Sequence, residues 1–68
     1  SFLHMKAKIG QTLEVLIEGN SKKSDKHFYG RTTFNSTVIF PKDKYKIGDY
    51  VMVKIKDCTS ATLKGKII

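Results

Sequence analysis

The chain has 68 residues, with 13 Lys and Arg against 6 Asp and Glu and a formal net charge of +7. This length predicts one small domain, whose core leaves little room for a deep catalytic pocket. The positive charge favours polyanionic partners such as RNA, DNA or an anionic membrane surface, with ordinary solubility charge as the alternative.

Cysteine content limits the chemistry of the chain. Cys58 is the only cysteine, so the sequence excludes an internal disulfide and argues against a metal site built from thiolates. A small domain without disulfides fits a reducing, cytoplasmic location. Apolar runs are too short to span a bilayer, and we expect no membrane partner.

At the N-terminus, residues 1–7 are predicted to be a disordered tail. The dipeptide His4-Met5 is typical of a cloning junction, so we expect part of this tail to come from a vector. The folded domain is then predicted to cover residues 8–68.

Period-two alternation predicts five short strands and no helix. The predicted strands cover residues 12–18, 27–33, 37–40, 50–56 and 62–68. The side chains expected to face the core are Leu13, Val15, Ile17, Val51, Val53, Ile55, Leu63 and Ile67. Short strands at this spacing indicate an all-β barrel or sandwich, and closure is favoured because an open sheet of this size leaves its edges uncovered.

Glycines lie inside two of these strands. Gly30 and Gly65 interrupt otherwise regular strand patterns, where glycine usually marks a bulge or a sharp bend. We therefore expect the barrel to turn its corners there.

The chain offers no plausible active site. His4 and His27 stand in the tail and at a loop edge, and Glu14 and Glu18 are about 13 Å apart along a strand, too far to cooperate as an acid pair. We expect this chain not to be an enzyme by itself.

A basic loop and one arginine are the candidate RNA-binding residues. Lys22, Lys23 and Lys26 share a loop from which flexible ammonium groups can reach phosphates. Arg31 can make a bidentate phosphate contact, and Gly30 beside it permits close approach. The alternative is that Arg31 pairs with a glutamate, Glu14 or Glu18, across the sheet.

Further basic and aromatic residues alternate along the strands. The outward lysines of the last two strands, which pairing would join into a stripe, are Lys54, Lys56, Lys64 and Lys66. Stacking surfaces for bases are available from Phe28, Tyr29, Phe34 and Tyr50. We expect at least two of these aromatic residues to fill the core instead.

From residue 8 to residue 68 the chain closely resembles the TRAM domain that ends radical-SAM tRNA methylthiotransferases. The residues that carry the resemblance are Gly10, Leu13-Glu14-Val15-Leu16-Ile17-Glu18-Gly19, Ser21-Lys22-Lys23, Gly30-Arg31-Thr32, Asn35, Val38, Phe40-Pro41, Gly48-Asp49, Val53-Lys54-Ile55 and Ala61-Thr62-Leu63-Lys64-Gly65. Their order and spacing are intact over nearly the whole chain.

The resemblance implies a small five-stranded antiparallel OB-like barrel that binds tRNA. Its RNA contacts would come from Lys22, Lys23, Lys26, Arg31, Lys54 and Lys64. The parent enzyme would methylthiolate an isopentenyl-modified adenosine 3′ of the anticodon, using S-adenosylmethionine and 4Fe–4S clusters bound elsewhere. The implied partners are the tRNA anticodon stem-loop and the catalytic radical-SAM domain of the same polypeptide, and no DNA partner is expected.

Two positions depart from the family pattern. Ser36 stands where a basic residue is often found, and Phe34 occupies a place that is frequently polar. A second class of function also stays open: a protein-interaction barrel that docks on the catalytic core of the enzyme or on another protein.

Overall fold

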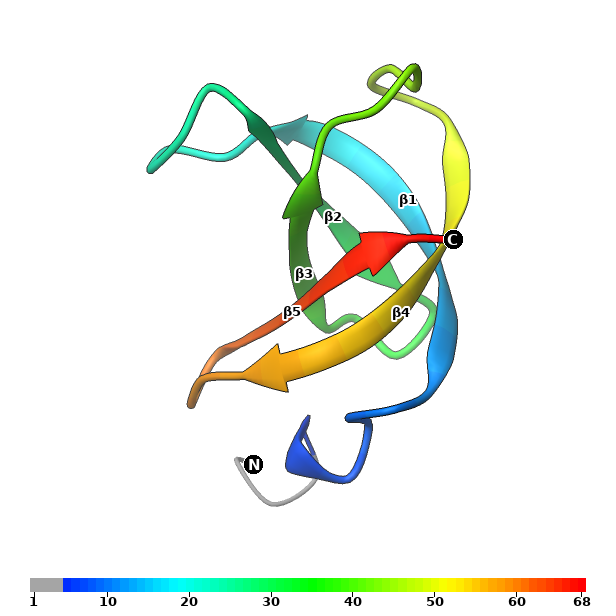
Figure 1. Ribbon diagram of the computed structural model, residues 1–68, viewed down its shortest axis with the longest axis vertical. Coiled ribbons are helices and arrows are strands. Elements are labelled where there is room, and N and C mark those ends of the chain that lie inside the picture. Colours follow the sequence, from blue (N-terminus) through cyan, green and yellow to red (C-terminus); the bar gives the residue numbers. More distant parts are fainter. Residues whose placement is uncertain (1–4) are drawn as a thin grey trace.

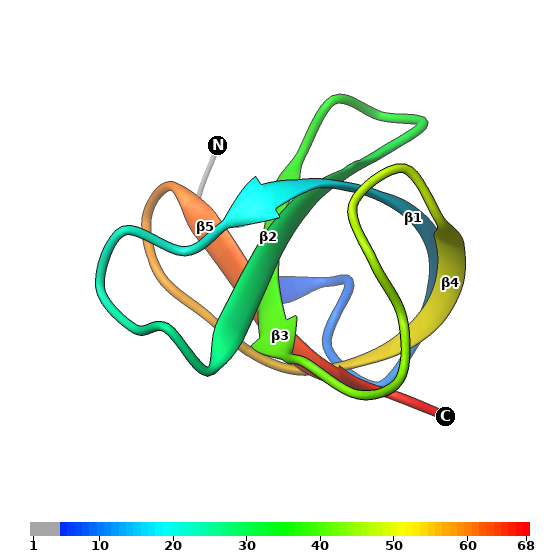
Figure 2. The same ribbon diagram turned by 90° about the horizontal axis from the view of Figure 1, so that it is seen from above.

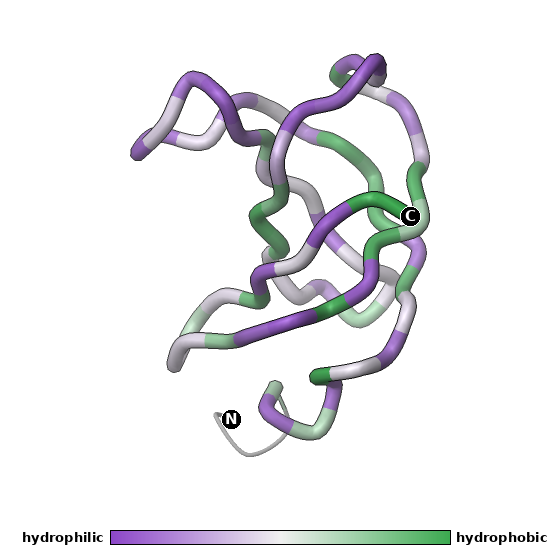
Figure 3. The backbone as a smooth tube through the Cα atoms, viewed as in Figure 1, coloured by the Kyte–Doolittle hydropathy of each residue, from purple (hydrophilic) through white to green (hydrophobic). Residues whose placement is uncertain are grey.

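A computed structural model describes residues 5–68 and contains the five predicted strands (Figure 1). Their bounds are β1 (Thr12–Asn20), β2 (His27–Thr32), β3 (Thr37–Pro41), β4 (Tyr50–Cys58) and β5 (Thr62–Ile67). The long connections β1–β2 and β3–β4 are mostly hydrophilic, whereas apolar residues concentrate in the strands (Figure 3). Alternation along the chain therefore located every strand.

The strands close into a barrel in the order β1-β2-β3-β5-β4 (Figure 2). The all-β barrel expected from the sequence is confirmed, but its strands are not all antiparallel, because β3 and β5 run parallel. Parity explains this correction. In a closed ring with an odd number of strands, directions cannot alternate all the way round, so at least one neighbouring pair must be parallel.

One hydrophobic cluster fills the barrel. Six of the eight predicted core side chains are buried, and Leu13 and Ile67 are partly buried against them. The aromatic filling differs from the expectation that at least two of four named rings would be core. Of those four only Phe28 is buried, because Phe40, whose ring packs edge-on 6.3 Å from that of Phe28, occupies the centre.

The two strand glycines sit where neighbouring strands approach closely. A Cβ atom on Gly30 would overlap the carbonyl oxygen of Leu16, and one on Gly65 would overlap that of Lys54. Opposite each glycine, the partner strand carries an extra residue, with register shifts between Ile17 and Gly19 and between Ile55 and Asp57. The predicted bulges are therefore present, on the strands facing the glycines.

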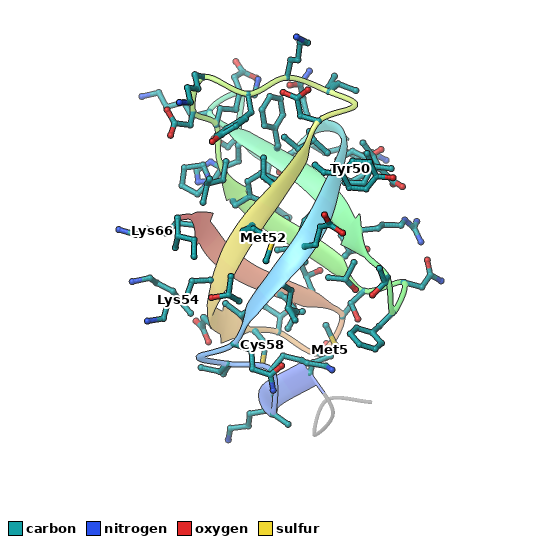
Figure 4. All side chains as sticks on the ribbon, turned by 90° about the vertical axis from the view of Figure 1, so that its right-hand side faces the viewer. Met5, Tyr50, Met52, Lys54, Cys58 and Lys66 are labelled. Atoms are coloured by element: carbon teal, nitrogen blue, oxygen red, sulfur yellow. The ribbon has the colours of Figure 1, made fainter. Side chains whose placement is uncertain are left out.

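Met5 and Lys6 lie in a single helical turn ahead of the barrel, and the elements assigned within residues 5–68 are the five strands, as the sequence predicted. Met5 and Cys58 both pack against the core, and Figure 4 shows them at the same end of the barrel. Residues 1–4 of the predicted N-terminal tail lie outside the described residues. Within residues 5–68, no helix has the length and apolar character needed to cross a membrane.

Candidate nucleic-acid interface

Strand register builds a mixed aromatic and basic row on the outer face of the barrel. Ile39 of β3 pairs with Tyr29 of β2 on one side and with Lys64 of β5 on the other. Because these side chains alternate with the buried ones, all three point outward. The row thus offers an aromatic surface, an apolar centre and an ammonium group in sequence across three strands.

A second, polar row lies beside the first. Thr37 of β3 pairs with Arg31 of β2 and with Thr62 of β5. Hydroxyl groups here can hydrogen-bond to ribose or phosphate oxygens, as they do in many nucleic-acid complexes. Together the two rows form the outer surface of β2, β3 and β5, which we call the β2–β3–β5 face. Bases of a single-stranded nucleic acid can stack on this face while its backbone is held by the polar side chains.

Serines shape the β1–β2 loop, residues 21–26, at the border of this face. We call this segment the lysine loop. Ser21 is buried, and its amide donates to the carbonyl of His27 over 2.8 Å. The Ser24 hydroxyl accepts from the Lys26 amide at 3.2 Å and lies 3.0 Å from His27 Nδ1. These contacts fix the loop while Lys22 and Lys23 stay exposed.

Between this loop and β5 runs a groove of about 400 Å³, which we call the basic groove. Its lining includes Lys23 and His27 from the loop side, Ile39 from β3, and Thr62 and Lys64 from β5. An adjoining recess of about 380 Å³ adds Lys22 and Tyr29. The arrangement can hold an anionic chain against an apolar floor, with cations on both rims.

The five lysines among the predicted RNA-binding residues fall into three groups. Lys22, Lys23 and Lys64 come together around the basic groove and its recess. Lys26 is exposed on the loop but lines neither hollow. Lys54 pairs with Lys66, beside which it lies in Figure 4, and it lines neither the groove nor the recess.

Arg31 has the glutamate partner that the sequence left as an alternative. Its Nε donates to Glu18 Oε1 at 3.1 Å, and its Nη1 donates to Asn35 Oδ1 at 2.8 Å. Glu18 is the unpaired bulge residue of β1, between the pairs Ile17–Gly30 and Gly19–Tyr29, and its side chain reaches the Arg31 guanidinium from there. The Arg31 side chain is 46% exposed and remains within reach of solvent anions.

The outer face of β1 and β4 has a different character. Tyr50 pairs with Leu16 and Met52 pairs with Glu14, and we call these four residues the β1–β4 face. Tyr50 is 66% exposed and Met52 is 45% exposed. Figure 4 looks onto this face, with Met52 near the centre of the view and Tyr50 above it and to the right.

Sequence reasoning missed the contributions of β3 to the interface. Ile39 and Thr37 were read only as part of a short strand, and His27 only as a loop-edge residue. Their outward positions follow from alternation, but their meeting with Thr62 and Lys64 follows from the parallel β3–β5 pair. That pairing had no local signal in the sequence.

The residues present do not fit an iron–sulfur cluster. Such clusters are held by several cysteine thiolates, and Cys58 is the only cysteine in the chain. Within residues 5–68, no three His, Cys, Asp or Glu side chains are grouped closely enough to hold a metal ion.

A family model for the TRAM domain matches residues 6–68. The chain belongs to the TRAM domain family. The match spans all five strands and the basic groove, so the TRAM domain is the whole of the folded unit described above.

Curated relatives are much longer proteins. A relative from Flavobacterium psychrophilum, named tRNA-2-methylthio-N(6)-dimethylallyladenosine synthase, is 62% identical over 60 residues, which are 88% of this chain and 12% of that protein. A protein of the same name from Karelsulcia muelleri is 52% identical over 67 residues, 98% of this chain and 15% of its own length. This TRAM domain therefore spans about an eighth of the relatives that it matches.

Proposed function

We propose that this TRAM domain is the RNA-binding accessory domain of a tRNA-modifying methylthiotransferase. The observation that carries the proposal is the Tyr29–Ile39–Lys64 row, which crosses β2, β3 and β5 beside the lysine loop. Stacking on an aromatic ring and charge neutralisation by lysines are the two interactions that single-stranded nucleic acid requires. A domain of this kind supplies affinity for the substrate, while the reaction takes place elsewhere.

The names of the relatives support a proposal about the substrate and the parent enzyme. We propose tRNA as the RNA, bound through its anticodon stem-loop, with the modified adenosine 3′ of the anticodon as the target. Radical-SAM chemistry, with S-adenosylmethionine and 4Fe–4S clusters, would belong to a catalytic domain in the same polypeptide. This work on tRNA would place the protein in the cytoplasm.

Titration of the ¹⁵N-labelled chain with an anticodon stem-loop tests the RNA proposal. We expect the largest amide shift changes at Lys22, Lys23, Tyr29, Ile39 and Lys64, with affinity that falls steeply as salt rises. An unmodified DNA hairpin of the same sequence serves as the control for the sugar. Shift changes confined to the β1–β4 face, or none at all, would contradict RNA binding through the basic groove.

A second candidate function is docking on the remainder of the parent polypeptide. The β1–β4 face favours it, because Tyr50 and Met52 expose apolar surface there. Figure 1 shows the start of β4 on the side of the barrel opposite the β1–β2 loop. The relatives offer a partner, since most of their length lies outside the matched segment. Adding that separately expressed remainder to the labelled chain should shift Tyr50 and Met52 while sparing Lys22 and Lys23.

A further inference from the structure

An exposed aromatic ring stands at the tip of the β2–β3 hairpin. Phe34 is 64% exposed, although large apolar side chains in a small barrel are normally needed in the core. It lies at the end of the β2–β3–β5 face remote from the lysine loop, two residues beyond the last residue of β2. The function proposed above makes no use of this ring.

The hairpin tip holds Phe34 outward by a fixed backbone. The buried Thr32 hydroxyl accepts hydrogen bonds from the amides of Phe34 and Ser36, each at 3.2 Å. Asn35 adopts a positive φ of 64°, a conformation that Asn tolerates better than most residues. Arg31 braces the same Asn35 through its side chain. The ring is therefore presented by an ordered turn, which lowers the entropy cost of binding.

A cation and a hollow adjoin the ring. Lys8 Nζ lies 4.1 Å from the centroid of the Phe34 ring, which is cation–π geometry. Phe34, Lys8 and Thr37 line a recess of about 490 Å³ that also reaches Ala61. Thr37 lines the recess next to the basic groove as well, so the two hollows meet the same residue of β3.

We infer that Phe34 and Lys8 form a second nucleotide subsite, in which one unpaired base stacks on the face of the exposed Phe34 ring opposite the Lys8 ammonium, while Lys8 contacts a neighbouring phosphate. This inference rests on the RNA function proposed above and extends it to the opposite end of the same face. An RNA strand would run from the lysine loop, across Thr37, to the hairpin tip. A ring that offers a π-face and no base-edge hydrogen bonds predicts stacking with little preference for sequence.

Tryptophan substitution gives a direct readout, because the chain contains no tryptophan. In Phe34→Trp, saturation with a single-stranded oligoadenylate of about ten nucleotides should strongly quench and shift the fluorescence, since the base stacks on the indole. Tyr50→Trp is the matched control, because Tyr50 is equally exposed on the β1–β4 face. Its fluorescence should stay unchanged at the same RNA concentration.

Affinity supplies the second measurement. Phe34→Leu keeps apolar bulk but removes the stacking surface, so the dissociation constant for the oligoadenylate should rise about fivefold or more. Tyr50→Leu should leave it unchanged. Unfolding curves for both variants should match the unsubstituted chain, because both side chains are exposed.

The outcomes separate this subsite from the RNA function itself. If Lys22→Ala with Lys23→Ala weakens binding while Phe34→Leu does not, and the Phe34→Trp signal stays flat, the subsite is wrong and the basic groove stands. If the unsubstituted chain fails to bind both the oligoadenylate and the anticodon stem-loop, both proposals fall.

Discussion

The basic groove and the β1–β4 face use the same alternation of inward and outward residues, yet they differ in chemistry. On one side, outward positions carry Tyr29, Ile39 and Lys64 beneath a lysine loop. On the other, they pair Tyr50 with Leu16 and Met52 with Glu14. Alternation along a strand decides which side chains face outward, whereas the order of the strands decides which of these side chains lie next to one another.

The first test concerns the closed barrel that supports both surfaces, and asks whether the close approach of β4 and β5 stabilises it. In Gly65→Ala, the added Cβ would overlap the Lys54 carbonyl oxygen, so the β4–β5 pair must shift. We expect a loss of about 1–3 kcal/mol in the free energy of unfolding, measured by urea denaturation. Lys66→Ala, an exposed neighbour on β5, is the control and should change it by less than about 0.5 kcal/mol. Equal stability of the two variants would contradict the close approach of β4 and β5.

The second test compares two lysine pairs of equal charge. Lys22→Ala with Lys23→Ala should weaken binding of an anticodon stem-loop about tenfold at low salt and flatten the salt slope by roughly two. Lys54→Ala with Lys56→Ala removes the same charge from β4, outside the groove, and should cost less. Fluorescence anisotropy over a salt series measures both. Equal losses would mean that a diffuse positive field, rather than the basic groove, attracts the RNA.

The third test concerns Arg31, which lies between the two surfaces. Arg31→Lys keeps the charge but loses the paired donors that hold Glu18 and Asn35, so unfolding should become easier by about 0–1 kcal/mol. RNA affinity should fall less than in the Lys22 and Lys23 variant. A double-mutant cycle with Glu18→Gln isolates the ion pair. A large affinity loss with the fold intact would instead assign Arg31 to an RNA phosphate.

The fourth test probes the β1–β4 face alone. Tyr50→Ser with Met52→Ser should change the unfolding free energy by less than about 1 kcal/mol and leave RNA affinity unaltered, because both side chains are largely exposed. Calorimetry and anisotropy check these values. Loss of RNA binding would show that the RNA wraps onto this face and would erase the contrast between the two surfaces.

The fold was largely predictable because alternation marks a strand wherever one face is buried. Val15, Val53 and Leu63 are fully buried as their spacing indicated. The candidate site was predictable only in part. Lys22 and Lys23 follow from loop composition, but their meeting with Lys64 depends on β3 lying beside β5. Strands distant in the chain pair because the ring must close, which no local pattern encodes.

The burial of an individual side chain could not be predicted where only tertiary packing distinguishes it from other residues of the same type. Three phenylalanines have the same intrinsic hydrophobicity but different positions in the barrel. These positions bury Phe28 and Phe40 and expose Phe34. The contact between Arg31 and Glu18 also depends on a bulge. The sequence predicted that bulge at Gly30 on β2, but it lies at Glu18 on the facing strand β1.

The parallel seam between β3 and β5 has a consequence for how the barrel opens. It is joined by only three residue pairs, Thr37 to Ile39 with Thr62 to Lys64, whereas every other seam has five. We therefore expect the barrel to open locally between β3 and β5 first, so the amide hydrogens of this pair should exchange with solvent fastest. RNA bound across the same residues would hold β3 and β5 together. RNA binding should therefore slow amide hydrogen exchange in these two strands.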